Sequence, residues 1–592
     1  MKQFFKFMFA SALGTILASI VVIFIMITMI VGVAMGLQEE TEGKAKISEH
    51  SVLRISWKTD IKDKSSDNPF EGFDFATMEP NKQVGLNDIL KNIEKATHDD
   101  NIDGIFLDME TLPAGAATME EIRNKLESFK KSGKFIYSYA NNYDQKAYYL
   151  ATVSDKIFLN PQGFILFKGL HVQMMFFKGL LDKLDVETQV IRGPNNKYKS
   201  AVEPLLYDKA TAANKEQLQT LINSIWGNML STISKNRGIS VSKLNELADN
   251  LELSTAEAAL QNNFIDSIVY RDQMLDILRH KTKTGKVKFV SFSKYNNVAP
   301  KHHVNKSKDR IAIIYAEGEI KQGKSSPGTI GSESLSETIR KVRKLSRIKA
   351  IVFRVNSPGG DADASEFIRR ELELASKKMP VIVSMGNVAA SGGYWISTPG
   401  KYIFAEDATI TGSIGVFGII PNLQKLFNNK LGITFDNVQT NKNADFIDVM
   451  KPMSPYQKAV MDNQIKRIYG NFVELVSKSR KLDKQYVDSI ARGRVWAGSD
   501  AIRIGLVDSI GGLERAVAAA AAEAGLGSNY RISEYPKEKD FFQSLIEGFS
   551  GEASVKMVKN EMGDYYKYYE RIKKIETMKG VQARLPYFVD VE

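Results

Sequence analysis

The sequence predicts an α/β protein made of two tandem repeats that follow an N-terminal transmembrane helix. Three observations support this fold class: an uncharged apolar run near the N-terminus, two stretches of chain that resemble each other, and an alternation of short β-branched runs with amphipathic helical stretches. Apolar runs that alternate with helices are typical of a largely parallel sheet with helical connections.

The first element is the run Phe7–Leu37, which contains no charged residue. As a helix rising about 1.5 Å per residue, it is longer than the roughly 30 Å hydrocarbon core of a bilayer. Lys2 and Lys6 precede the run and acidic residues follow from Glu39, so we expect residues 1–6 in the cytoplasm and the body of the chain outside. The alternative is a cleaved signal peptide, whose apolar region is only about 7–15 residues long. We therefore expect a retained anchor.

Two pairs of segments indicate the internal repeat. Residues 101–115 match residues 347–360, because each reads as a buried strand before a turn that contains Pro-Ala-Gly or Pro-Gly-Gly. Residues 135–161 match residues 381–407, with the apolar positions in register. Both pairs have the same separation along the chain, which is typical of a duplication.

The repeats are predicted at residues 45–300, which carry the candidate base, and 308–535, which carry the candidate nucleophile. The polar, lysine-rich segment 281–308 has no helical periodicity and is interpreted as the linker. Residues 536–592 form a C-terminal tail, predicted to be helical from its charged, tyrosine-rich pattern at 552–578.

Strands and amphipathic helices are expected to alternate within each repeat. The strand expected at 52–56 in the first repeat corresponds to the one expected at 311–316 in the second repeat. In the second repeat we expect strands at 311–316, 349–355, 380–385 and 402–405, and helices at 334–345 and 364–378.

Composition excludes several kinds of site. The 592 residues include no cysteine, so disulfides, thiolate metal sites and a cysteine nucleophile are ruled out. The six histidines are few and scattered, which argues against a metal site built from several histidines and leaves carboxylate sites open. The net charge of +11 is compatible with nucleic acid, but lysines alternate with acids, as in residues 119–134. We interpret the charge as solvated surface and expect no nucleic-acid partner.

The candidate nucleophile is in the segment GNVAASGGYWIST, residues 386–398. Ser391 is predicted to lie where a loop enters a helix, and Gly392 and Gly393 beside it allow close approach of a substrate backbone. This setting suits a nucleophilic serine. The alternative is a helix N-cap with tight packing.

Two further turns supply candidate groups. The sequence SPGG at 357–360 offers the N–H groups of Gly359 and Gly360 to a developing oxyanion, although an ordinary turn has the same residues. The segment TGSIGVFG, residues 411–418, adds Ser413.

No histidine is near these motifs, so the base is predicted to be a lysine whose pKa is lowered by burial. The candidate is in KYKSAVEP, residues 197–204 of the first repeat. The aligned position of the second repeat has Ala444 or Asp445, whereas Ser391 aligns with Gln145. Each copy therefore lacks what the other retains, as expected of a duplicated enzyme with one composite site.

These four motifs, in the order in which they occur along the chain, resemble the long form of the signal peptide peptidase A family, also called protease IV. The resemblance covers nearly the whole chain, and only Asn387, where an aspartate is expected, departs from the pattern. It implies that Ser391 is the nucleophile, Lys199 rather than Lys197 the general base, and Ser413 the residue that orients the lysine. It also implies an oxyanion region at Gly359 and Gly360, with Gly392 and Gly393 adjacent to the substrate.

The family also implies Clp/crotonase-like repeats, a membrane-anchored serine endopeptidase and no cofactor. The expected substrates are hydrophobic peptides such as remnant signal peptides, and the expected assembly is a homo-oligomer, a tetramer in the long form. The expected location is the bacterial inner membrane, in contact with its lipid bilayer, with a single pass and the catalytic body on the periplasmic side. A crotonase-type acyl-CoA enzyme and a non-catalytic envelope scaffold or chaperone are the competing interpretations.

Overall fold

The computed structural model describes residues 47–65, 84–193, 196–299, 306–537 and 580–585, with scattered positions within 3–21 and 73–80. No helix among the described residues is long and apolar enough to cross a membrane. Most of the predicted anchor at Phe7–Leu37, and the helical pattern predicted at 552–578, lie outside the described residues.

The first sheet is parallel throughout, in the order β8-β6-β5-β4-β1-β9. Its strands are β1 (Ser51–Ile55), β4 (Ile102–Asp108), β5 (Phe135–Ala140), β6 (Lys156–Leu159), β8 (Ser267–Ile268) and β9 (Lys288–Ser291). The helices α2 (Leu86–Thr97), α3 (Ala116–Lys130) and α4 (Gln145–Ala151) lie between these strands in sequence.

The second sheet repeats this arrangement in the order β20-β16-β15-β13-β10-β21. Its strands are β10 (Arg310–Glu317), β13 (Ile348–Ser357), β15 (Val381–Ala390), β16 (Tyr402–Ala405), β20 (Ser509–Ile510) and β21 (Arg531–Tyr535), and β17 (Ile410–Gly412) and β19 (Val495–Ala497) continue it beyond β15. The intervening helices are α12 (Ser332–Lys344), α13 (Ala362–Ser376) and α14 (Gly392–Ser397). The strands and helices predicted for this repeat are confirmed.

Local sequence explains these elements. Strand β13 is buried along most of its length because it is a run of apolar, largely β-branched residues between two neighbouring strands. Helix α12 buries Leu335, Ile339 and Val342, which share one face at helical spacing.

The segment interpreted as a linker at 281–308 is shorter than predicted. Strand β9 lies within it and pairs in parallel with β1, and α11 (Phe292–Asn296) follows. Lys288–Ser291 places only one side chain, Val290, in the core proper, so the polar composition concealed an edge strand.

A third sheet joins the two halves of the chain, in the order β12-β11-β14-β22-β18-β7. It contains β7 (Glu187–Ile191), β11 (Glu319–Lys321), β12 (Thr329–Gly331), β14 (Gly359–Asp361), β18 (Phe417–Asn422) and β22 (Gly580–Arg584). Strand β7 comes from the first half and pairs with β18 of the second. Strand β22 belongs to the predicted C-terminal tail and comes after the helical pattern predicted at 552–578.

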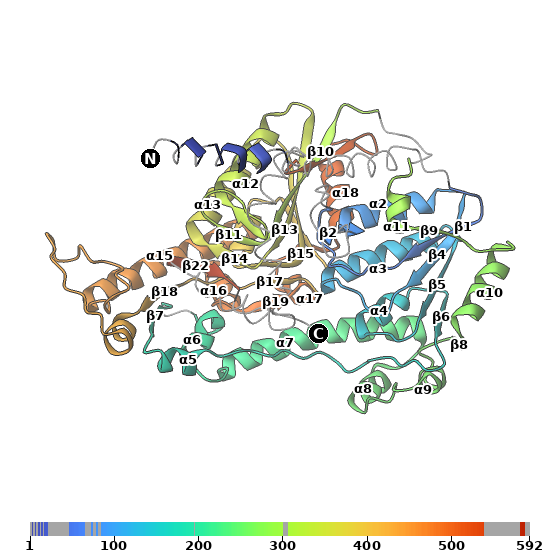
Figure 1. Ribbon diagram of the computed structural model, residues 1–592, viewed down its shortest axis with the longest axis horizontal. Coiled ribbons are helices and arrows are strands. Elements are labelled where there is room, and N and C mark those ends of the chain that lie inside the picture. The colour runs from blue at the N-terminus through green and yellow to red at the C-terminus, as the bar shows by residue number, and fades with distance from the viewer. Residues whose placement is uncertain are drawn as a thin grey trace.

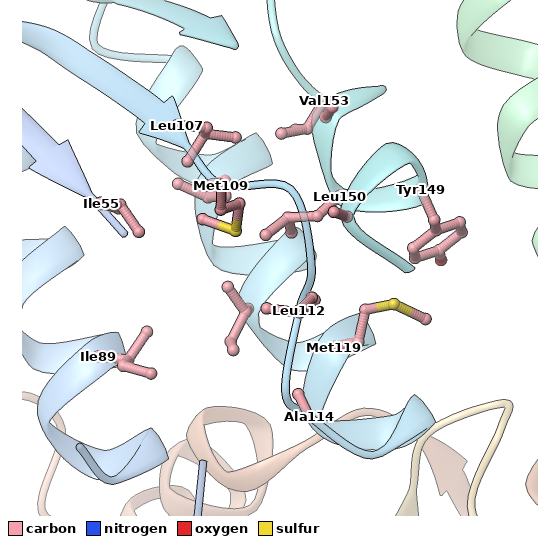
Figure 2. Close-up of a cluster of buried hydrophobic side chains, with 14 of the residues drawn as sticks. Ile55, Ile89, Leu107, Met109, Leu112, Ala114, Met119, Tyr149, Leu150 and Val153 are labelled. Carbon is pink, nitrogen blue, oxygen red and sulfur yellow. The ribbon is translucent and has the colours of Figure 1, made fainter. Parts of the chain in front are cut away.

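The largest core cluster contains side chains from both halves. Figure 2 shows its first-half portion, where Met109, Leu112 and Ala114 from the chain after β4 pack with Met119 and Leu150. The chain after β13 holds the SPGG turn in the second half. Apolar side chains thus fill the first-half position that corresponds to the candidate site.

Helix α7 (Ala212–Arg237) spans both halves along one side of the molecule (Figure 1). It starts with a cap in which the side chain of Thr211 accepts from the N–H of Asn214, and ends at Gly238, which has a left-handed φ of 69°. Ser224 donates to Asp500 of the second half, and Arg237 pairs with Asp266 of the first.

A buried ion cluster also connects the halves. Arg354 on β13 is 0% exposed, and its Nη2 lies 2.7 Å from Oδ1 of Asp63 and 2.6 Å from Oε1 of Glu121. Burial opposes the charge on Arg354, but the two carboxylates raise its pKa above the ordinary value. Glu121 also accepts the N–H of Leu513 at the start of α18 (Leu513–Glu523).

Replacing Arg354 with Met should lower the free energy of unfolding by about 3–5 kcal/mol, because two buried carboxylates lose their cation. Urea denaturation of the two proteins measures the difference. Arg370→Met is the control, since Arg370 is 52% exposed and pairs only at the surface with Glu373; it should change the value by less than about 0.5 kcal/mol. A loss below about 1 kcal/mol for Arg354→Met would contradict a structural role for the cluster.

Candidate active site

Ser391 lies between the end of β15 and the first residue of α14, with a φ of 55° and a ψ of −114°. A positive φ is unusual for a residue with a Cβ and indicates a backbone held by its surroundings. The N–H of Ser391 donates to the carbonyl of Gly412 at 2.8 Å, and its carbonyl accepts the N–H of Trp395 at 2.8 Å. These bonds fix the backbone of Ser391 between β17 and the first turn of α14.

Lys199 comes from the first half of the chain, in the segment between β7 and α6 (Glu203–Leu206). Its Nζ lies 2.9 Å from Oγ of Ser391, 3.0 Å from Oγ of Ser413 and 3.0 Å from the carbonyl oxygen of Ser413. The side chain is fully buried, and burial lowers the pKa of Lys199 well below its usual range. The structure thus brings together the three residues on which the sequence analysis concentrated.

Lys197 is directed elsewhere. Its Nζ donates to the hydroxyl of Tyr198 at 3.2 Å and lies 4.8 Å from the centre of that ring. The two lysines therefore have different surroundings, and Lys199 is the one that reaches Ser391.

The loop before β19 holds the serine and lysine segments together, and sequence reasoning did not identify it. The N–H of Ser413 donates to the carbonyl of Arg494 at 2.6 Å, and the N–H of Tyr198 donates to the carbonyl of Arg492 at 3.0 Å. Gly493, between them, has a φ of 81°, and a Cβ there would lie 2.5 Å from Cβ of Lys199. Only glycine fits this contact; the sequence signal was the unassigned Gly-Arg-Val-Trp at 493–496.

Gln217 on α7 is a second residue that sequence reasoning missed. Its amide nitrogen donates to the carbonyl of Tyr198 at 2.9 Å and to Oγ of Ser200 at 3.0 Å, on either side of Lys199. Its amide oxygen accepts the N–H of Val495 at 3.3 Å. Gln217 is 0% exposed, so one buried amide links the lysine segment to β19.

A stack of side chains covers the other side of the lysine segment. The guanidinium carbon of Arg494 lies 4.8 Å from the ring centre of Tyr198 and 4.6 Å from that of Trp496. Glu216 accepts a hydrogen bond from Arg494 at 3.2 Å. Such contacts between cations and aromatic rings stabilise the loop that carries Gly493.

The glycines named by sequence lie around Ser391. Gly359 and Gly360 belong to β14 rather than to a free turn, and the N–H of Gly359 donates to Oγ of Ser357 at 3.2 Å. A Cβ on Gly359 would lie 2.6 Å from the backbone nitrogen of Gly392, and one on Gly393 would lie 2.5 Å from the carbonyl oxygen of Ser357. These glycines allow the end of β13 and β14 to approach the start of α14 beside the serine.

The position that matches Ser391 in the first half has a different function. Gln145 is the first residue of α4, and its amide oxygen accepts the N–H groups of Lys168 and Gly169. Asn387, where the family pattern has an aspartate, bonds Thr118 of α3 through both its oxygen and its nitrogen. Both side chains make structural contacts.

Comparisons with known proteins show which family the chain belongs to. The model of peptidase family S49 matches residues 128–285 and 373–527. Protease 4 from Salmonella typhi is 36% identical over 89% of this chain and 87% of its own length. A chloroplastic serine protease, SPPA from Arabidopsis thaliana, is 34% identical over 76% of this chain and 68% of its own length.

Among solved structures, ClpP1 from Listeria monocytogenes is 16% identical to this chain, with a TM-score of 0.23 over 34% of this chain and 91% of that one. The similarity in sequence to the two proteases is far stronger than this similarity in structure. Because relatives more than 30% identical match over most of both lengths, the chain belongs to peptidase family S49 and is a serine peptidase.

Proposed function

We propose that this chain is an endopeptidase that uses Ser391 as nucleophile and Lys199 as general base. The observation that carries the proposal is the 2.9 Å separation of Nζ of Lys199 from Oγ of Ser391 in a fully buried setting. A neutral amine has two N–H donors and one lone pair. The two oxygens of Ser413 accept the N–H groups, which leaves the lone pair for the hydroxyl proton of Ser391.

In the proposed reaction, Nζ of neutral Lys199 takes the proton from Ser391 while Oγ bonds to the carbonyl carbon of the substrate. Backbone N–H groups at Gly359 and Gly360 stabilise the oxyanion, with the bond from Gly359 to Ser357 exchanged for one to the substrate; each such donor is worth about 3 kcal/mol. The tetrahedral species breaks its C–N bond, and the Lys199 ammonium protonates the leaving amine. Lys199 then deprotonates a water molecule that hydrolyses the ester and restores Ser391.

We also propose that the substrates are hydrophobic peptides, such as signal peptides left after cleavage of preproteins. The apolar cluster next to Ser391 supports this, since Ala390 packs there with side chains that offer no charge. The uncharged run Phe7–Leu37 supports a membrane location, with the catalytic body on the periplasmic side of the bacterial inner membrane.

The same proposal includes a homo-oligomer, a tetramer in the long form of the family. Its support is the segment between β18 and α15 (Pro455–Arg480), which projects from the body in Figure 1. This segment exposes Leu431, Ile433, Phe435 and Val438. Exposed apolar side chains that gather on one projection are typical of protein contacts.

Ser391→Ala and Lys199→Met should each lower kcat/KM on a fluorogenic hydrophobic peptide by about a thousand-fold or more, since each removes a reacting group. Lys199→Met should also raise the free energy of unfolding at neutral pH, because the folded chain no longer buries an amine that prefers to be charged. Activity assays and urea denaturation measure the two effects. Activity within about tenfold of wild type in either variant would exclude the assigned role.

The value of kcat/KM is expected to rise with pH. Burial lowers the pKa of Lys199, so the neutral, active amine forms as pH rises through this lowered pKa. The logarithm of kcat/KM should rise and reach a plateau well below the ordinary lysine value of about 10.4. A rise centred near that value would mean that the base is an ordinary exposed lysine.

Gln217→Met should lower kcat by about 10- to 100-fold with little change in KM, because the lysine segment loses its link to β19 and small displacements of a reacting group are costly. The rise of the pH profile should also move upward, since water gains access to Lys199. Gln219→Met on the exposed face of the same helix is the matched control. An unchanged pH profile and kcat for Gln217→Met would limit Gln217 to a role in folding.

A further inference from the structure

The stretch between Asp276 and Asp309 is strongly basic. It contains eight lysines and one arginine, and no aspartate or glutamate. Elsewhere, as in residues 119–134, acidic residues alternate with the lysines and offset their charge. A block of like charges repels itself and often contacts a partner of opposite charge. Neither the fold nor the proposed reaction uses the charge of this stretch.

Four of these lysines gather around strand β9, at one end of the molecule (Figure 1). The first is in the last turn of α10 (Arg271–Thr282), the second follows that helix, the third precedes β9 and the fourth is its first residue. All four side chains are exposed. We call this group the lysine face, and its members are Lys281, Lys283, Lys286 and Lys288.

The charge of the lysine face is not neutralised by neighbouring side chains. Nζ of Lys288 donates to the carbonyl oxygen of Glu49 at 3.0 Å, which supplies no negative charge. The nearby carboxylate of Asp276 pairs with Arg279 of the same helix. Within the described ranges, none of the four lysines forms an ion pair with a carboxylate. Their positive charges are therefore available to a partner.

The lysine face lies where the chain reaches the body from the apolar run Phe7–Leu37. Ser51 of β1 is opposite Lys288 of β9, and the continuous described chain before β1 starts at Ile47. Nine residues separate Leu37 from Ile47. Fully extended, this connection spans at most about 36 Å, and as a flexible coil it spans about 17 Å. With the apolar run in a bilayer, the lysine face is therefore held close to the lipid headgroups.

Protection of an edge strand explains only part of this charge. Strand β9 is at the edge of the first sheet, and a lysine on an edge strand discourages pairing with other chains. Lys288 is within β9 and can serve this purpose. Lys283 and Lys286 lie before the strand and cannot block its edge. Their charge needs another explanation, and an anionic surface nearby provides one.

We propose that the lysine face docks the body of the protein on anionic lipid headgroups of the membrane that holds the apolar run. The proposal rests on the membrane location proposed above. Each lysine close to an anionic bilayer strengthens binding by about fivefold, and the attraction falls off within a Debye length of about 10 Å. The anchor and the lysine face are two separate points of attachment, so together they restrict the orientation of the body to the bilayer.

The test measures the distance between the lysine face and the bilayer. Because the chain has no cysteine, Gly285→Cys introduces a single site for a donor dye, and a Cβ there would meet no atom within 4 Å. The labelled full chain is reconstituted in vesicles whose headgroups carry an acceptor dye. The vesicles are phosphatidylcholine alone or with about 30% phosphatidylglycerol. Energy transfer should be about twofold higher in the anionic vesicles and should fall to the neutral value at about 0.5 M NaCl. Equal transfer in the two lipids at low salt would overturn the proposal.

A variant without three of the charges tests which residues dock. In the labelled chain, Lys283→Gln, Lys286→Gln and Lys288→Gln together should weaken docking about a hundred-fold and lower transfer in anionic vesicles to the neutral value. The matched control replaces three exposed lysines of the second half with glutamine, Lys341, Lys377 and Lys484, and should leave transfer unchanged. Full transfer in the first variant, or an equal loss in the control, would contradict docking through the lysine face.

Flotation with the same vesicles separates this proposal from the proposed membrane location. A chain that stays with both lipids at high salt is anchored, and the transfer measurement then decides whether it docks. A chain that floats only with anionic vesicles and leaves them at high salt docks without an anchor, so the membrane location fails and the lysine face stands. A chain that floats with neither lipid contradicts both proposals.

Discussion

The contact between Lys199 and Ser391 is the constraint on which the rest of the structure depends. The two residues come from different halves of the chain. Nζ of Lys199 lies 2.9 Å from Oγ of Ser391, and both side chains are buried. A buried amine loses hydration, and burial is the cause of the lowered pKa of Lys199. The site is therefore costly for folding, and surrounding contacts must hold the halves together.

Those contacts form a continuous frame. Arg354 links β13 to Asp63 and Glu121 of the first half, while β7 pairs with β18 across the halves. Helix α7 carries Gln217, which donates hydrogen bonds to Tyr198 and Ser200, the residues on either side of Lys199. The first half keeps the same strand order but fills its corresponding position with apolar side chains such as Met109 and Leu112. The first copy thus has a packed core where the second has the candidate site.

Much of this arrangement was predictable from sequence. Apolar runs and matching segments predicted the central strands of both repeats, and the glycine-rich motifs led to Ser391 and Ser413. The lack of a nearby histidine pointed to the segment 197–204, and the family resemblance selected Lys199 within it. Gln217 was not predictable, because a single glutamine in a polar helix carries no local sign of burial. Strand β22 was also missed, since its partners β14 and β18 are far away in sequence and only tertiary pairing defines it.

The central claim is that Lys199 is neutral at working pH, and direct titration of its amine tests this claim most closely. The full chain is labelled with [¹³Cε]lysine, and the Lys199 signal is assigned by its loss in Lys199→Met. The account predicts a midpoint well below the value of about 10.4 shown by surface lysines. A midpoint at or above that value would contradict it, because the amine next to Ser391 would then be protonated and unable to accept a proton.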